Sequence, residues 1–114
     1  MTLTINLTHS TEEDTYTNSA YEAVVDDTVV GFAETVTDEN STYVERVDIK
    51  EEYRNQGFGT AFLKAISAEY GSIFLAPDNA DAQRLYERIG CEMNERDYDK
   101  FGCYIDQGYG VYEI

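Results

Sequence analysis

The chain has few residues of several kinds, and each scarcity removes a class of protein. It contains one proline, two cysteines, one histidine and no tryptophan among its 114 residues. No apolar run approaches the roughly 18 residues that a membrane helix needs, and no basic segment followed by an apolar one precedes the rest, so no membrane association or signal peptide is expected. Cys91 and Cys103 share no metal or redox spacing, which predicts free thiols, no metal site and a cytoplasmic protein.

Positive charge is also scarce. The chain has 23 acidic residues against eight basic ones, a formal net charge of −15. Such a field repels nucleic acid and anionic membranes and attracts cations, so no direct binding to nucleic acid is expected. Three origins of the acidity remain open: adaptation to a salt-rich cytoplasm, steering of a basic substrate or protein partner, and imitation of nucleic-acid charge.

A length of 114 residues suits one domain, and its first half has the period of strands. Leu3, Ile5 and Leu7 alternate with polar residues, which predicts a strand over 2–8, and the polar stretch 9–19 is expected to be a loop. Strands are also predicted over 20–25, 28–36 and 42–49, with turns at Asp26–Asp27 and at residues 38–41. In the last of these strands we expect one face to carry Tyr43, Glu45, Val47 and Ile49.

The period then changes to that of helices. Apolar residues from Phe62 to Tyr70 predict a helix that ends at Gly71, and residues 72–76 have the length and composition of a strand. Asn79 is a good cap for a second helix, which carries its apolar stripe on Ala82, Leu85, Tyr86 and Ile89. Short strands are expected within 91–95 and 109–114. The fold class is therefore α/β (α+β): one domain over residues 1–114, with a mixed, mostly antiparallel sheet and two main helices.

The stretch from Arg54 to Thr60, RNQGFGT, lies between a predicted strand and the first turn of a helix. That turn leaves backbone N–H groups without partners and carries about +0.5 charge from the helix dipole. Glycines there let a phosphate group approach the backbone. The spacing fits neither a dinucleotide-binding nor a nucleotide-hydrolysing loop. Alone, the pattern is better explained by a glycine-rich turn from a strand into a helix.

A second motif, further along the chain, favours a functional interpretation of the first. The segment from Asn79 to Gly90, NADAQRLYERIG, is an Asn-capped helix with Leu85-Tyr86 midway and a closing glycine, after a short strand. It resembles the second signature of the GNAT superfamily of N-acetyltransferases, and Arg54, Gly57 and Gly59 resemble the acetyl-coenzyme A loop of that superfamily. Together the two motifs cover residues 42 to 91.

The resemblance implies a binding site for acetyl-CoA as cosubstrate. The backbone amides of Asn55, Gln56, Gly57, Phe58, Gly59 and Thr60 would hold the pyrophosphate, with Arg54 in the same motif. Val47 and Ile49 would pair through their main chain with the pantetheine arm, and an amide on that strand would face the thioester oxygen. Asn79 would contact the cosubstrate from the start of the second helix.

The resemblance also implies catalytic roles. Tyr86 matches the tyrosine that protonates the departing thiolate, although its place on an apolar stripe equally suits a core residue. Glu45, on the fourth strand, is a candidate base for the acceptor amine; a solvated surface glutamate is the alternative, and another residue or water could serve instead. The chain departs from the family because residues 9–19 are too short and too polar for the usual helices between the first two strands.

Two functions follow from these observations. An open acceptor side and an acidic field suggest acetyl transfer to an amine, above all a lysine on a basic protein or peptide. The alternative is a silent GNAT-fold binding protein whose acidity inhibits a nucleic-acid-binding partner. The sequence fixes neither the acceptor nor the oligomeric state.

Overall fold

The computed structural model describes residues 2–39, 41–77, 80–93 and 112–114. The chain divides into two units, Met1–Ile73 and Phe74–Ile114, and each is described by itself. Within the described residues, the first unit carries four strands and the longer helix, and the second carries the shorter helix and three two-residue strands.

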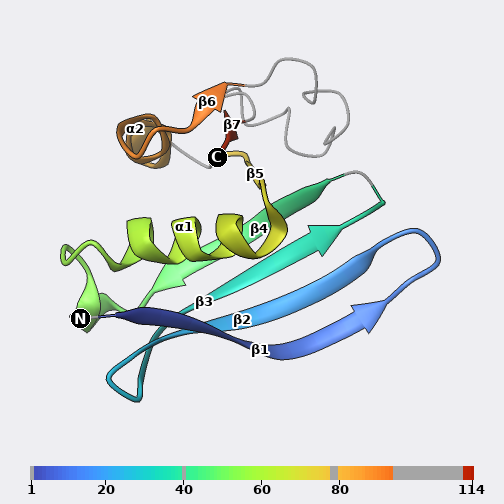
Figure 1. Ribbon diagram of the computed structural model, residues 1–114. Helices are drawn as coiled ribbons and strands as arrows, with labels where there is room; N and C mark the ends of the chain where they lie inside the picture. Colours follow the sequence, from blue (N-terminus) through green and yellow to red (C-terminus); the bar gives the residue numbers. More distant parts are fainter. Residues whose placement is uncertain (1, 40, 78–79, 94–111) are drawn as a thin grey trace. The chain divides into compact units, whose positions relative to one another are not determined.

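The four strands of the first unit form an antiparallel meander (Figure 1). They are β1 (Leu3–Glu12), β2 (Thr17–Val25), β3 (Thr28–Thr37) and β4 (Thr42–Ile49). Asp26 and Asp27 join β2 to β3 with φ values of 50° and 64°. Two consecutive left-handed residues make the kind of turn that matches the twist of a hairpin, so the predicted turn is confirmed. Asp38 and Ser41 close the β3–β4 turn, where the Ser41 amide donates to the Asp38 carboxylate at 2.8 Å.

The segment from residue 9 to residue 19 is not one loop, and this prediction was wrong. β1 continues to Glu12 and β2 already begins at Thr17, so only residues 13–16 connect them. The ladder continues through Ser10↔Ser19 and Glu12↔Thr17 after a register shift between Leu7 and His9. Main-chain hydrogen bonds and β-branched threonines sustain this part of the hairpin, and neither produces the apolar alternation by which a strand is recognised in sequence. The connection holds no helix, as its shortness predicted.

A β-bulge in β4 overturns the predicted grouping of Tyr43, Glu45, Val47 and Ile49 on one face. Thr35 on β3 pairs with Val44, but the neighbouring Glu34 pairs with Arg46, so Glu45 is the extra residue. Because an inserted residue reverses the alternation beyond it, Val44 shares a face with Val47 and Ile49, whose partners on β3 are Ala33 and Gly31.

Helix α1 (Phe58–Tyr70) covers one face of this sheet and contacts β1 and β4 (Figure 1). Phe62, Leu63 and Ile66, one helical stripe, are at most 1% exposed, which confirms the predicted helix. Buried residues of the sheet include Tyr21, Ala23, Ala33, Thr35 and Val44.

A hydroxyl cluster joins the end of α1 to the sheet. The Tyr21 and Tyr70 hydroxyl oxygens lie 2.6 Å apart, and Thr35 Oγ1 lies 3.3 Å from that of Tyr70. The two rings meet edge to face with centroids 6.2 Å apart. Burial, and then the hydrogen bond with Tyr70, raise the pKa of Tyr21 well above its usual value. The hydroxyl groups are thus satisfied as neutral donors and acceptors within the fold.

Gly31 lies on β3 where no side chain fits. A Cβ atom there would stand 2.6 Å from the Asp48 carbonyl oxygen and 2.7 Å from Ile49 Cδ1, at the end of β4. A backbone oxygen in a paired strand cannot move aside without distorting the ladder, so overpacking should cost about 1–3 kcal/mol.

We expect Gly31→Ala to lower the free energy of unfolding by that amount in chemical denaturation. It should also displace the end of β4, which leads into the residues that precede α1. Gly59→Ala is the matched control for stability, since a Cβ at Gly59 meets only Ile49 Cγ1, at 3.8 Å. Equal stability of Gly31→Ala and the wild-type protein would contradict this close approach.

The second unit holds the predicted later elements in shorter form. These are β5 (Phe74–Leu75), α2 (Ala80–Arg88), β6 (Glu92–Met93) and β7 (Tyr112–Glu113), and β7 pairs antiparallel with both β5 and β6. Gly90 has a φ of 97° just beyond α2, as a closing glycine requires. The remaining residues of the two predicted strands, 94–95 and 109–111, and Cys103 lie outside the described residues. Burial raises the pKa of the Cys91 thiol to about 11. In the described part of the chain, no helix has the length and apolarity to cross a bilayer.

Candidate active site

The predicted anion-binding loop lies between β4 and α1. After Lys50, residues Glu51–Tyr53 form a short 3₁₀ helix, which the sequence did not predict. Asn55 has a φ of 64° and Gly57 one of 82°, and Gly57 is the N-cap of α1. Two left-handed residues two positions apart turn the chain sharply from the sheet into the helix.

The first turn of α1 presents backbone donors. The Ala61 amide donates to the Gly57 carbonyl at 3.1 Å, and the amides of Phe58, Gly59 and Thr60, which precede it, have no acceptor within a helix. No side chain caps the helix at Gly57, and its first turn holds no acidic residue. The N–H groups and the positive end of the helix dipole are therefore available to an anion.

Arg54 ties the loop to the end of β4. Its Nε donates to the Ile49 carbonyl oxygen at 2.9 Å, and its Nη2 lies 3.3 Å from Asp48 Oδ1. The two side chains of this ion pair are about half exposed, so it contributes little to stability. Its effect is to orient the loop, and it leaves the guanidinium at the surface beside the predicted phosphate site.

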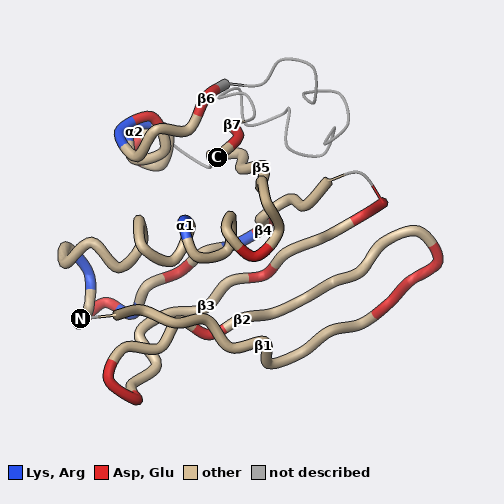
Figure 2. Tube along the Cα trace, in the orientation of Figure 1, with Lys and Arg blue, Asp and Glu red and all other residues tan. Residues whose placement is uncertain are grey.

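The charges of the first unit are arranged unevenly along the sheet. Lys50, Arg54 and Lys64 lie on or near the loop and α1, at the end of the sheet that also holds the acidic β2–β3 turn. The β1–β2 and β3–β4 turns at the other end carry acidic residues and no basic ones (Figure 2). Glu51 and Glu52, which precede the loop, are both exposed to solvent, where their charges are screened. The loop end is thus the less acidic end of this unit.

The predicted residues of β4 lie next to this loop in the chain. Val47 and Ile49 are half-buried on the face that α1 covers, and Glu45 is the exposed residue of the bulge. The structure therefore brings Val47, Ile49 and the loop residues 54–60 together within one unit. Glu45 stands four residues before Ile49, roughly 13 Å along the strand from it.

Tyr86 belongs to α2 in the second unit and is half-buried. Its ring meets that of Tyr112 edge to face, with centroids 6.4 Å apart. The Tyr112 hydroxyl accepts a hydrogen bond from Gln83 Nε2 at 3.0 Å. Asn79, predicted to cap α2 and to contact the cosubstrate, lies outside the described residues.

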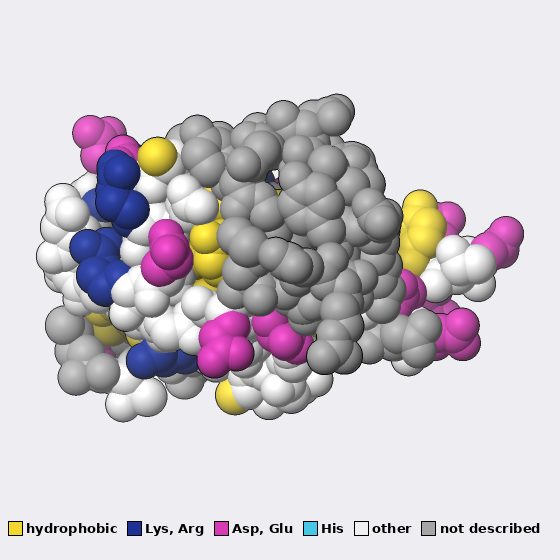
Figure 3. All heavy atoms as spheres, turned by 90° about the horizontal axis from the view of Figure 1, so that it is seen from above, with side chains coloured by type: hydrophobic (Ala, Val, Ile, Leu, Met, Phe, Trp, Pro, Cys, Tyr) yellow, Lys and Arg dark blue, Asp and Glu magenta, His cyan; other side chains and the backbone are white. Residues whose placement is uncertain are grey.

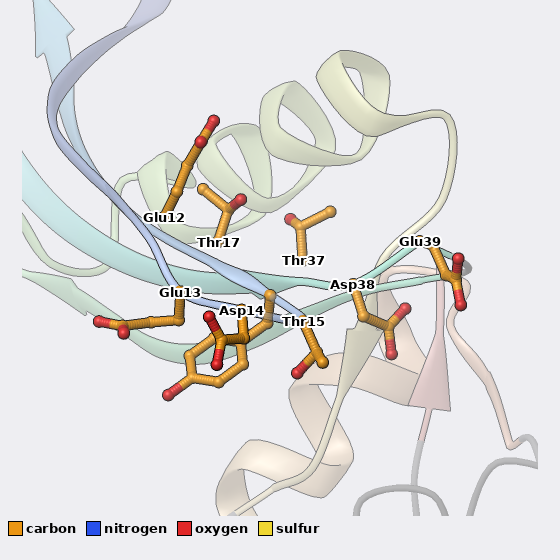
Figure 4. Close-up of a pocket in the computed structure, with 9 residues that line it drawn as sticks. Glu12, Glu13, Asp14, Thr15, Thr17, Thr37, Asp38 and Glu39 are labelled. Atoms are coloured by element: carbon orange, nitrogen blue, oxygen red, sulfur yellow. The ribbon is translucent and has the colours of Figure 1, made fainter.

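An acidic pocket lies at the end of the sheet away from the loop (Figure 4). It encloses about 480 Å³ and is open to solvent. Its lining comes from the β1–β2 and β3–β4 turns and the strand ends that flank them: Glu12, Glu13, Asp14, Thr15, Tyr16, Thr17, Thr37, Asp38 and Glu39. Glu12, Thr17 and Thr37 point to one side of the sheet in the close-up. In the space-filling view, the projecting hairpin tip carries mostly Asp and Glu side chains (Figure 3).

Sequence reasoning missed this pocket because its residues come from two separate turns, 20 residues apart counting from Thr17 to Thr37. Each turn has a composition that is common on protein surfaces. The available signal was that two acidic turns flank strands that pair through β2 and β3, which brings both turns to the same end of a meander. Among the residues that the structure describes, no three His, Cys, Asp or Glu side chains are placed to hold a metal ion.

An antiparallel meander, a bulged fourth strand and a helix whose glycine-rich first turn follows that strand define an α+β fold with a candidate anion-binding turn. A model of the acetyltransferase (GNAT) family matches residues 3–91. The chain therefore belongs to the GNAT family, whose members are acyl-CoA N-acyltransferases with acetyl-CoA as cosubstrate. This confirms the family predicted from the two motifs and the fold class predicted from the order of strands and helices.

Solved structures share the fold at low sequence identity. A GNAT family acetyltransferase from Elizabethkingia anophelis with acetyl-CoA bound is 16% identical, with a TM-score of 0.64, over 82% of this chain and 78% of that one. The Escherichia coli protein YhhK bound to coenzyme A is 11% identical, with a TM-score of 0.65, over 99% of this chain and 98% of that one. The E. coli ribosomal-protein-S18-alanine N-acetyltransferase is 22% identical, with a TM-score of 0.56, over 73% of this chain and 57% of that one. A search of curated sequences found no match.

Proposed function

We propose that residues 1–114 act as one acetyl-CoA-binding domain that transfers acetyl to a cationic amine, a lysine side chain or an N-terminus on a basic protein or peptide. The observation that carries the acceptor class is the acidic pocket, with five carboxylates from two turns. It lies beyond the end of the sheet at which β4 begins, whereas the loop follows the end of β4, roughly 23 Å further along the strand. A cosubstrate held at the loop end leaves the pocket end for the acceptor.

A protein acceptor also fits the short β1–β2 connection. Residues 13–16 are too few to fold over a small amine, so the pocket stays open and can admit a side chain or terminus that projects from a larger molecule. One structural neighbour is named for acetylating an alanine of a ribosomal protein, which is an acceptor of this kind.

Each of the predicted site residues has a separate role in the proposed reaction. The amides of residues 55–60 bind the pyrophosphate, Arg54 adds positive charge beside it, and the main chain at Val47 and Ile49 aligns the pantetheine arm. Acetyl-CoA supplies the acetyl group as a thioester. Glu45 accepts the proton of the acceptor amine, directly or through water, and Tyr86 donates a proton to the departing sulfur. Asn79 contributes a contact from the start of α2.

A proton acceptor is needed because a lysine amine with an ordinary pKa of about 10.4 is neutral in only about one molecule in 2,500 at pH 7. The carboxylates of the pocket attract the cationic form, and only the neutral form attacks. The pocket therefore raises the local concentration of acceptor, and a base elsewhere must remove the proton.

The charge of the pocket can be tested with a matched pair of double variants. Glu12→Gln/Asp14→Asn removes two negative charges from the pocket, and Asp26→Asn/Asp27→Asn removes two from the β2–β3 turn at the opposite end of the sheet. We expect the pocket variant to lower kcat/KM for a lysine-rich peptide about tenfold at low ionic strength, and the turn variant to change it less than twofold.

The readout is release of coenzyme A thiol with acetyl-CoA and the peptide, at low and at physiological salt. The difference between the variants should shrink as salt rises, because salt screens the attraction. Equal kcat/KM in both variants would contradict the assignment of the acceptor to the pocket. If the protein bound acetyl-CoA but released no coenzyme A thiol in the presence of any basic peptide, the alternative of a silent acidic binding protein would be favoured.

A further inference from the structure

β1 is an edge strand of unusual composition for this chain. Among the residues that the structure describes, it pairs with β2 and with no other strand. Residues 2–11, TLTINLTHST, contain no Asp, Glu, Lys or Arg, although these make up 27% of the chain. Edge strands are usually protected from pairing by charged residues, proline or a short length. β1 is ten residues long and has neither charge nor proline over its first nine.

The side chains of β1 also indicate that its outer edge is unprotected. The partners of β1 on β2 include Val25, Ala23 and Tyr21, which are buried on the face that α1 covers. They pair with Leu3, Ile5 and Leu7, respectively. Leu7 is nonetheless 57% exposed. An apolar side chain in that position gains burial if another strand continues the sheet beside it.

We propose that β1 pairs antiparallel with β1 of a second copy of the chain about a twofold axis, so that the two meanders form one continuous sheet. A twofold interface must be self-complementary, and an uncharged strand meets this condition in a protein of net charge −15 where a charged one would not. The register shift after Leu7 limits the flat part of the strand to residues 3–7. Pairing centred on Ile5 sets Leu7 of each copy opposite Leu3 of the other.

This arrangement also keeps the acidic hairpin tips apart. With the axis at Ile5, the Glu12 residues of the two copies lie at opposite ends of the paired strands, roughly 46 Å from each other. This distance is several Debye lengths at physiological salt. The remaining repulsion between two chains of net charge −15 is spread over their surfaces, so association should become tighter as salt increases.

Sedimentation equilibrium from micromolar to millimolar concentration tests the proposal. We expect a monomer–dimer equilibrium whose Kd falls several-fold between low and physiological salt, the opposite of an interface held by ion pairs. Leu7→Glu and Thr4→Glu should each raise the Kd at least tenfold, because each places two like charges at the shared edge. Ala68→Glu, on the exposed face of α1, adds the same charge away from the edge and should change the Kd less than twofold.

Amide hydrogen exchange gives a second readout that does not depend on variants. Amides of residues 3–7 that face away from β2 should gain protection only at concentrations where the dimer forms. A monomer throughout the concentration range, a dimer that Leu7→Glu and Ala68→Glu affect equally, or a dimer without new protection in β1 would each overturn the proposal.

Discussion

Gly59→Ala is expected to fold as stably as the wild-type protein, or up to about 1 kcal/mol more stably, and to bind acetyl-CoA about tenfold more weakly. The stability follows from the structure, because a Cβ at Gly59 meets only Ile49 Cγ1, at an ordinary 3.8 Å, and Gly59 is not in a left-handed conformation. Alanine is also the better helix former. The chain itself therefore has no need of glycine at the second position of α1.

The loss of affinity follows from the proposed contact. An anion bound to the amides of Phe58, Gly59 and Thr60 must approach the backbone closely, and a methyl group at Gly59 stands beside that approach. A tenfold change in Kd corresponds to about 1.4 kcal/mol. Isothermal titration with acetyl-CoA measures it, and chemical denaturation measures the stability of the same sample.

Gly71→Ala is the matched control at the other end of α1. Gly71 has a φ of 83° with open space around it, so alanine there is strained by about 1 kcal/mol or more but is far from the loop. We expect the two variants to differ in which property they lose. Gly59→Ala should lose affinity for acetyl-CoA and keep its stability, and Gly71→Ala should lose stability and keep its affinity. Unchanged affinity in Gly59→Ala would mean that the first turn of α1 does not receive the pyrophosphate.

Tyr86→Phe is expected to lower kcat about 10²-fold or more while leaving the KM for acetyl-CoA within about twofold. A phenyl ring preserves the edge-to-face contact with Tyr112, so the variant removes the hydroxyl group that would protonate the departing thiolate. A side chain that acts only on the reaction step changes kcat and kcat/KM alike and spares binding.

Tyr112→Phe separates this role from packing. It removes the acceptor of the 3.0 Å hydrogen bond from Gln83 and leaves the same pair of rings in contact. We expect a loss of about 1 kcal/mol in stability and little change in kcat. If Tyr86→Phe retained wild-type turnover, the tyrosine would be a packing residue of α2 and the proton would come from elsewhere.

The sequence predicted the parts of the fold that rest on periodicity and on turn chemistry. The apolar stripe of α1, the Asp26–Asp27 turn and the glycine at the end of α1 were all placed correctly, because each depends on residues close together in the chain. The polar half of the β1–β2 hairpin was missed, since its ladder is held by main-chain hydrogen bonds that leave no side-chain pattern. The bulge at Glu45 was missed as well, because the register of a strand is set by its partner.

The candidate site divides in the same way. The turn at Gly57 and the helix that follows it could be predicted, because they are a local structure between one strand and one helix, whereas the role of Gly57 and Gly59 in binding was predicted from the family resemblance. The acidic pocket could not be predicted, because it joins residues 12–17 to residues 37–39 through the pairing of three strands. The attachment of Arg54 to the Ile49 carbonyl depends likewise on how the loop folds back on β4. The roles of Glu45 and Tyr86 remain predictions.

Backbone amide NMR during titration with coenzyme A tests most directly that the turn between β4 and α1 holds the cosubstrate. We expect the largest chemical-shift changes of the first unit at the amides of residues 55–60 and smaller ones at Val47 and Ile49, all following one saturation curve. Saturable binding that leaves the amides of residues 55–60 unshifted would contradict it.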